Sequence, residues 1–149
     1  MLKVTRGSIF DGNHQVIVNP VNCVGVMGKG LAKSFKLRYP DMFEHYKIQC
    51  LREKVRIGLG CKFETDDGVL ILCAPTKDHW RSKSNPWIIN SSLDWIYSEL
   101  KRIEFCSVGI PAIGCGEGGL NFNDVLTAIE FKLTNLNHDI HVYRPEKRH

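Results

Sequence analysis

The amino-acid sequence predicts an α/β protein, a three-layer α/β/α sandwich with a mixed central sheet. Short apolar runs typical of strands alternate along the chain with segments that have the 3.6-residue periodicity of helices. Two of these runs end in glycine-rich loops that lie far apart in the sequence. An Asp-Gly turn joins two other runs into a hairpin, so we expect an antiparallel pair within the sheet.

Six segments are expected to form strands, because each is short, apolar and bounded by turn residues. They are residues 2–6, 15–19, 59–64, 69–74, 105–110 and 140–143. The hairpin joins the third and fourth of them through Thr65-Asp66-Asp67-Gly68.

Four segments are expected to form helices, at residues 28–39, 41–51, 86–100 and 123–135. Pro40 ends the first helix, and Asp41 is expected to be the N-cap of the second. Either Ser84 or Asn85 caps the third helix, with Pro86 at its first position.

The chain has 149 residues, enough to bury a substantial core, and we expect one domain over residues 1–149. Its 43% hydrophobic and 24% charged residues are ordinary for a globular protein. No apolar run is long enough to cross a membrane, and the N-terminus lacks the apolar region of a signal peptide. We therefore expect a cytoplasmic protein without a membrane partner, and nothing in the sequence requires more than a monomer.

The net charge of +4 is concentrated in two stretches, residues 29–38 and 77–83. Clustered cations fit a ligand that carries phosphates. The alternative is a solvated helix face followed by a polar loop. The isoelectric point of 8.8 stays below the value of about 9 that is typical of dedicated nucleic-acid modules.

The six cysteines are expected to be free thiols, because none forms a C-x-x-C pair or lies at zinc-site spacing with a histidine. We therefore expect no metal site, and no cofactor. Cys23 and Cys115 fall inside the glycine loops, which leaves a nucleophilic role open for them. No histidine lies near either thiol in the sequence to activate it.

The two glycine-rich loops, residues 22–30 and 111–119, are the candidate ligand site. Glycine allows backbone N–H groups to approach a ligand closely, and such loops bind anions where they open onto helix N-termini. Both loops follow strands, so they are expected at the carboxyl edge of the sheet. Two of them predict a ligand with more than one phosphate.

Gly114, Gly116 and Gly119 form a literal G-x-G-x-x-G, but the chain does not fit a dinucleotide-binding fold. That fingerprint opens a βαβ unit with an acidic residue after the next strand, whereas Asp139 precedes the next expected strand. The first loop lacks the spacing of a P-loop.

Two side chains at expected strand ends are candidates for contact with the rest of the ligand. Asn22 can offer a donor and an acceptor to a pair of sugar hydroxyls, or it can stabilise its own loop as a turn residue. Lys77 follows the strand at residues 69–74, where nearby cations and partial desolvation would make its amine a usable nucleophile or base. The alternative for Lys77 is a lysine that pairs with phosphate or faces solvent.

The run from Ile17 to Ala32 resembles the first signature of the macrodomain family, and Gly109 to Gly116 resembles its second, phosphate-binding signature. Val4 to Phe10 is similar to the family's first strand and the turn after it. The similarity covers nearly the whole chain. The first loop and the segment from Pro75 to Trp80 are most similar to the branch that includes the bacterial DarG antitoxins and the human terminal ADP-ribose glycohydrolase.

This resemblance implies a protein that binds ADP-ribose and removes it from a modified macromolecule, a thymine base of DNA in the DarG-like case. Lys77 matches the catalytic lysine of the branch, Asn22 matches the asparagine near the distal ribose, and Ile9 would lie near the adenine. The implied diphosphate-binding residues are Gly28, Lys29, Gly30, Gly114, Cys115, Gly116, Gly118 and Gly119, and Val26 and Met27 are further implied contacts of ADP-ribose.

The implied partner is ADP-ribose or an ADP-ribosylated macromolecule, with DNA as one candidate. Lys29, Arg81 and Lys83 would flank the mouth of the site and guide a nucleic acid through its phosphates. The chain is expected to be a macrodomain that stands alone or is cut from a longer DarG-like protein.

Two positions depart from the family pattern. Many macrodomains have an aspartate after the first strand that binds the adenine amino group; here residues 8–10 stand there, with Asp11 nearby, so backbone groups would hold the adenine. The human glycohydrolase has an aspartate in its second loop where this chain has Gly118, next to Glu117. DarG-like sequences tend to have glycine there. The second catalytic group is therefore unassigned.

Three functions follow as hypotheses. The first is an ADP-ribosyl glycohydrolase in which Lys77 attacks C1″ of the ribose and water resolves the intermediate. The second is a reader that binds ADP-ribose without turnover. The third is an ADP-ribose-1″-phosphate phosphatase, for which His79 is the histidine near the site in sequence.

Overall fold

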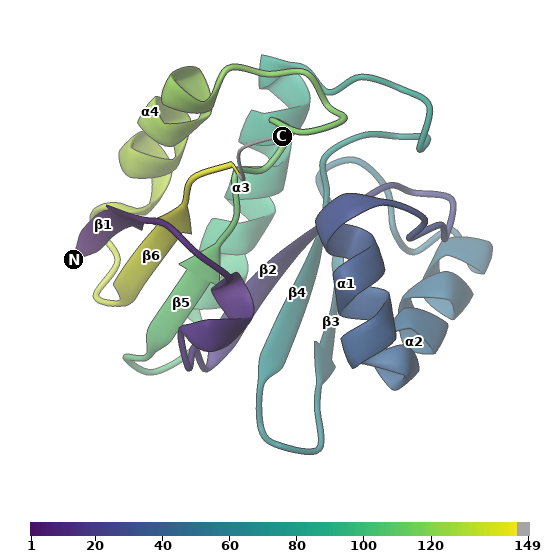
Figure 1. Cartoon of the computed structure of the whole chain (residues 1–149), viewed down its shortest axis with the longest axis horizontal. Helices are drawn as coiled ribbons and strands as arrows, with labels where there is room; N and C mark the ends of the chain where they lie inside the picture. Colours follow the sequence, from purple (N-terminus) through teal and green to yellow (C-terminus); the bar gives the residue numbers. More distant parts are fainter. Residues whose placement is uncertain (146–149) are drawn as a thin grey trace.

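A six-stranded sheet with the strand order β1-β6-β5-β2-β4-β3 forms the centre of the computed structural model, which describes residues 1–145 (Figure 1). The strands are β1 (Leu2–Thr5), β2 (Val16–Val21), β3 (Cys61–Glu64), β4 (Leu70–Pro75), β5 (Ser107–Ile110) and β6 (Asp139–Tyr143). Neighbouring strands are parallel except in the β3–β4 hairpin. The predicted mixed sheet and its hairpin are confirmed.

Helices cover both faces of the sheet (Figure 1). They are the 3-10 helix η1 (Ile9–Asp11) and the α-helices α1 (Gly30–Arg38), α2 (Pro40–Leu51), α3 (Pro86–Lys101) and α4 (Phe122–Leu133). Leu93 and Ile96 of α3 and Ile129 of α4 belong to the buried cluster on one face. Phe35 of α1 and Tyr46 of α2 belong to the cluster on the other. The predicted three-layer sandwich is therefore confirmed.

The predicted helix boundaries hold to within a few residues, but the cap of α2 is wrong. Tyr39, not Asp41, is the N-cap, and Pro40 takes the first helical position, to which its fixed φ is suited. Asp41 lies in the first turn, where a carboxylate interacts favourably with the helix dipole. Helix α1 begins at Gly30 rather than Gly28, because Lys29 is still extended.

Asn85, not Ser84, caps α3: its side-chain oxygen accepts a hydrogen bond of 2.9 Å from the N–H of Ile88. Strands β2 and β4 continue past their predicted ends, to Val21 and Pro75. These last residues pair in register, so the two strands end side by side.

Strands β5, β2 and β4 are adjacent and parallel, so the loops that follow them leave the sheet at one edge. They are the first glycine loop (residues 22–29), the lysine loop (residues 76–85) and the second glycine loop (residues 111–121). Figure 1 shows them along the upper side of the sheet. No helix within residues 1–145 is long and apolar enough to span a membrane.

Candidate functional site

The lysine loop is hydrogen-bonded to both glycine loops. The N–H of Cys23 donates to the carbonyl of Asp78 at 2.9 Å. On the other side, the N–H of Ser84 donates to the carbonyl of Gly118 at 3.1 Å, and Nζ of Lys83 donates to the carbonyl of Glu117 at 3.4 Å. Three loops from distant parts of the sequence therefore form one unit.

Lys77 lies in the middle of this unit. Its Nζ donates to the carbonyl of Trp80 at 3.0 Å. Partial burial lowers the pKa of Lys77, the carboxylate of Glu117 raises it, and the charges of Lys83 and Lys29 lower it. The net direction is downward, so the amine loses its proton more readily than that of an exposed lysine. This favours the nucleophile or base that the sequence predicts.

Asn22 is 4% exposed, and its side chain is engaged within the protein. Its Nδ2 donates to the carbonyl of Val26 at 2.7 Å. Its Oδ1 accepts from the N–H groups of Val24 at 3.1 Å and Val26 at 3.4 Å, and from the hydroxyl of Tyr46 at 2.8 Å. An amide oxygen has two lone pairs, so its capacity to accept is filled. These bonds support the loop-stabilising alternative, and contact between Asn22 and a ribose stays a prediction.

The other predicted ligand residues fall into an exposed and a buried group. Ile9 and Met27 are buried in the cluster on the α1–α2 face, so only their backbone could contact a ligand. Cys115 is half-buried. Exposed residues, open to a ligand, are Val26, Gly28, Lys29, Gly30, Gly116 and Gly119. Gly114 and Gly118 are buried.

The two glycine groups differ in what a Cβ atom would meet. At Gly116 and Gly30 it would find nothing within 4 Å, and at Gly28 the nearest atom is 3.7 Å away. At Gly118 it would lie 2.5 Å from the carbonyl oxygen of Gly114, so this position needs glycine for close packing. An aspartate could not stand at Gly118 without a shift of the loop. The carboxylate whose charge raises the pKa of Lys77 is that of Glu117, the residue before Gly118.

Only the first glycine loop opens onto an uncapped helix. Lys29, the N-cap of α1, makes no side-chain capping bond, and the first turn of α1 contains no acidic residue. The N–H groups there are available to an anion. At α4, by contrast, the side chain of Asn121 accepts from the N–H of Asp124 at 3.2 Å. The second loop can therefore contribute its own backbone but not an uncapped helix.

The cysteines of the two loops are poor candidates for a nucleophile. Burial, with the charge of Asp78 and the nearby Cys50 thiol, raises the pKa of Cys23 to about 12. Burial alone raises the pKa of Cys115 to about 11. Both thiols are protonated near neutral pH, and a thiol attacks as its thiolate. All six cysteines are free, as the sequence predicts.

The first basic stretch divides between two places. Nζ of Lys36 lies 4.4 Å from the centre of the Phe43 ring, and the guanidinium of Arg38 lies 4.9 Å from that of Phe10. These contacts lie between η1, α1 and α2. Of this stretch, Lys29 is the residue whose charge acts on Lys77.

His79 is engaged within the lysine loop. Its Nδ1 accepts a hydrogen bond of 3.1 Å from the backbone N–H of Arg81, and its ring lies 5.2 Å from that of Trp80. Within residues 1–145, no three His, Cys, Asp or Glu side chains converge to hold a metal ion.

Two features of the site were not evident from the sequence. Tyr46 lies on α2, and its bond to Asn22 spans 24 positions of the sequence. Ser84 was a candidate cap, yet its Oγ is one of two buried side-chain oxygens without a hydrogen-bond partner in the described part of the chain. A buried unpaired hydroxyl costs about 1–3 kcal/mol, which a polar ligand atom at the loop junction would offset.

Comparison with known proteins identifies the family of this fold. The Macro domain family profile matches residues 18–129. The DNA ADP-ribosyl glycohydrolase of Mycobacterium tuberculosis is 40% identical over 130 residues, which cover 84% of this chain and 36% of that protein. The chain spans between 36% and 43% of the length of the first curated relatives that it matches.

Solved structures match the whole fold. The macrodomain of Mycobacterium tuberculosis DarG superposes with a TM-score of 0.94 at 34% identity, covering 98% of this chain and 99% of that one. A structure of Thermosipho africanus DarTG in complex with ADP-ribose gives a TM-score of 0.89 at 33% identity, covering 99% of this chain and 43% of that one. With both signature loops inside the matched region and the complete sheet shared with solved macrodomains, the chain belongs to the macrodomain family.

Proposed function

We propose that this macrodomain binds ADP-ribose and hydrolyses the bond between its distal ribose and a modified macromolecule. The observation that carries the proposal is the amine of Lys77, on which charges from both glycine loops act and whose pKa is lowered. Relatives 40% and 35% identical are named DNA ADP-ribosyl glycohydrolases, and a related solved structure contains ADP-ribose.

The diphosphate would lie between the two glycine loops. Gly28, Gly30 and Gly116 have no side chain to block it, and a Cβ at Gly30 or Gly116 would face open space. The uncapped N-terminus of α1 supplies N–H donors, and Lys29 supplies a charge beside them. The reacting C1″ would then face Lys77.

The amine of Lys77 attacks C1″ as the bond to the leaving group breaks, through an oxocarbenium-like centre. The leaving group departs with the bonding electrons. The attacking amine loses a proton, and we assign its acceptance to the carboxylate of Glu117, whose charge acts on this amine, and its delivery from the resulting carboxyl to the leaving group. Water then adds to C1″, which releases ADP-ribose and restores the free amine.

The linkage that we propose is the one to a thymine base of DNA, because the similar relatives are named for action on DNA. A linkage to an acidic protein side chain is the second candidate. The phosphatase hypothesis has less support, because the one histidine that it would use accepts a hydrogen bond within its own loop.

A side-by-side assay on thymine-linked, glutamate-linked and phosphate-linked ADP-ribose tests the proposal. We expect the wild type to release ADP-ribose from the thymine-linked substrate and Lys77→Ala to be slower by about a hundredfold or more. Calorimetry should find that the variant still binds ADP-ribose. Full turnover by folded Lys77→Ala would rule out this mechanism. Tight binding with no product from any substrate would instead identify a reader.

We also propose that the protein acts as a monomer in the cytoplasm. The six free thiols support a reducing compartment. Light scattering on the eluting protein should give the mass of a single chain, and a dimer mass would contradict the proposal.

A further inference from the structure

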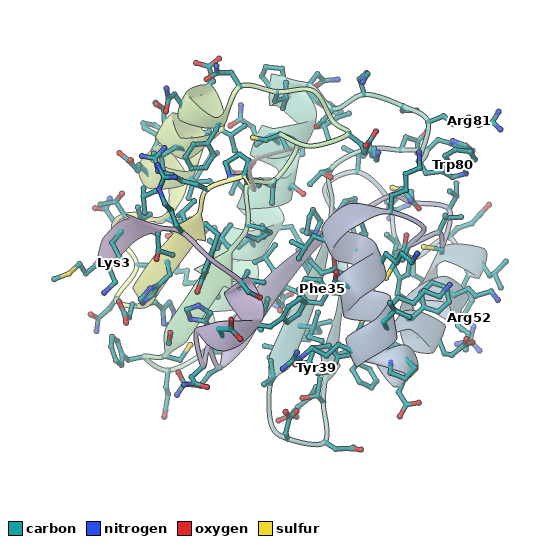
Figure 2. All side chains as sticks on the ribbon, in the orientation of Figure 1. Lys3, Phe35, Tyr39, Arg52, Trp80 and Arg81 are labelled. Carbon is teal, nitrogen blue, oxygen red and sulfur yellow. The ribbon has the colours of Figure 1, made fainter. Side chains whose placement is uncertain are left out.

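An exposed stack of aromatic and basic side chains projects from the lysine loop. Trp80 is 41% exposed. The ring of His79 lies 5.2 Å from its ring at an angle of 31°, and the guanidinium carbon of Arg81 lies 4.5 Å from its centre. Figure 2 shows Trp80 and Arg81 together at the rim of the molecule, directed away from its body.

Hydrogen bonds hold this stack in place beside the reacting amine. The N–H groups of Arg81 and Ser82 donate to Nδ1 and to the carbonyl of His79, at 3.1 and 2.9 Å. The carbonyl of Trp80 accepts from Nζ of Lys77 at 3.0 Å. The indole ring therefore lies within one side-chain length of the atom that the amine contacts. None of the chemistry proposed for Lys77 uses this ring.

We propose that Trp80 and Arg81 bind the nucleotide next to the ADP-ribosylated one in a single-stranded nucleic acid. The inference rests on the proposed function, since it names what else of the substrate the protein holds. The base would stack on Trp80, and the phosphate beside it would pair with Arg81.

The exposed contact between Arg81 and Trp80 is a weak one that a base can replace. A cation over an exposed ring contributes less than a stacked nucleobase does. A base that takes the place of the guanidinium on the ring frees Arg81 for a charge-assisted pair with a phosphate. In the unbound protein, Arg81 therefore covers the ring face that the base would later occupy.

Charge and shape favour a single strand over a duplex or a protein. Lys29, Lys77, Arg81 and Lys83 outnumber the acidic groups that the structure brings to this rim, Asp78 and Glu117, which suits a phosphate backbone. Bases inside a duplex already have both faces stacked, so they cannot use an aromatic platform. A modified protein side chain offers neither a flat base nor a second phosphate.

The first test compares two substrates, ADP-ribosylated thymidine as a nucleoside and the same thymidine within a single-stranded oligonucleotide. We expect Trp80→Ala to lower the ratio of kcat/KM for the oligonucleotide to that for the nucleoside by about tenfold. Trp80→Phe should keep most of the ratio, because it keeps an aromatic face. Phe131→Ala, which removes another exposed aromatic ring on α4, should leave the ratio unchanged.

The second test measures binding of an unmodified single-stranded oligothymidylate by fluorescence anisotropy at several salt concentrations. Trp80→Ala should weaken binding with an unchanged slope of log affinity against log salt. Arg81→Ala should reduce that slope by about 0.7, the value for one phosphate contact on a single strand. An equally tight complex with the matching duplex would overturn the inference.

The two tests separate this inference from the proposed function. An active enzyme whose substrate ratio does not respond to Trp80→Ala would overturn the stacking site and leave the glycohydrolase intact. A wild type that cleaves neither substrate, yet binds oligothymidylate through Trp80, would overturn the glycohydrolase and support the stacking site.

Discussion

Gly116 and Gly118 stand two positions apart in the second glycine loop and have opposite surroundings. A Cβ at Gly116 would face open space, and one at Gly118 would collide with the carbonyl of Gly114. Neither glycine has a positive φ, so the difference between them is steric. We expect Gly116→Val to leave thermal unfolding unchanged and to weaken ADP-ribose binding by about tenfold or more, because it fills the space that the diphosphate needs.

Gly118→Ala is the matched change, and it should act on stability instead. Relief of the contact with Gly114 requires a backbone shift, at a cost of about 1–3 kcal/mol in the free energy of unfolding. Calorimetric unfolding and ADP-ribose titration of both variants check the pair. Normal binding by Gly116→Val would mean that the diphosphate does not cross Gly116.

The opposing charges around Lys77 predict opposite shifts in the pH dependence of the rate. The amine must be neutral to attack, so kcat/KM should rise with pH through the pKa of Lys77. Glu117 raises that pKa, so Glu117→Gln should move the rise to lower pH. Lys83 lowers it, so Lys83→Met should move the rise to higher pH.

The value of kcat/KM on the high-pH plateau of the same profiles tests whether Glu117 is the proton acceptor. If its carboxylate accepts the proton, Glu117→Gln should also lower the rate at high pH, whereas Lys83→Met should not. Shifts of both variants in the same direction would show that these charges do not control the reacting amine.

At the scale of the elements, the first glycine loop depends on α2 through Asn22 and Tyr46. Asn22→Ala would leave the N–H groups of Val24 and Val26 without their acceptor, while the Tyr46 hydroxyl would keep the backbone carbonyl of residue 22, which also accepts from it at 2.8 Å. We expect a loss of about 2 kcal/mol or more in the free energy of unfolding, and faster amide exchange in the loop. Tyr46→Phe removes the hydroxyl that donates to Asn22 and leaves the two N–H bonds to its side chain, so it should cost about 1 kcal/mol. Unchanged stability and exchange in Asn22→Ala would restore the reading of Asn22 as a ligand contact.

Local patterns predicted the elements well because their causes are local. The Asp-Gly turn fixes the β3–β4 hairpin, and Asn85 with Pro86 fixes the start of α3. Asp41 was misread because a good capping residue directly after a proline resembles a cap, although the proline itself takes the first helical position.

The candidate site was predicted less completely, because its partners are distant in sequence. Lys77 and the glycine loops could be found from motif and resemblance. The bond from Tyr46 to Asn22 and the effect of Glu117 on Lys77 arise only once α2 and the second loop pack against the edge of the sheet. A residue type alone could not tell a ligand contact from a loop brace at Asn22.

At the scale of the whole molecule, the sheet order makes the site. Strands β5, β2 and β4 are neighbours in space but not in sequence, and their parallel direction brings the three loops to one edge. The same order pairs β5 with β6 on the side of β2 away from β4, where Ser107 of β5 and Tyr143 of β6 belong to a second group of polar side chains.

His14 is the centre of that second group. Its ring nitrogens are hydrogen-bonded to Oγ of Ser107 on β5 and to the hydroxyl of Tyr143 on β6, both at 2.7 Å. Burial lowers the pKa of His14, the charge of His141 lowers it further, and that of Asp139 raises it. His14 therefore takes up a proton at lower pH in the native protein than in the unfolded chain, where its pKa has the ordinary value of 6.5.

This difference predicts a loss of stability on mild acidification. As the pH falls below about 6.5, the unfolded chain takes up a proton that folded His14 resists, so the free energy of unfolding should decrease by up to about 1.4 kcal/mol per pH unit until His14 titrates in the native state as well. Asp139, whose pKa is lowered by its bond to His141, adds a separate loss only in more acidic solution. Urea unfolding between pH 7.5 and pH 5, chosen as about one unit on either side of the ordinary value, measures the slope. His14→Gln should flatten the slope of unfolding free energy against pH, and the control His45→Gln, on α2, should not. An equal slope in His14→Gln and the wild type would mean that another group takes up the proton.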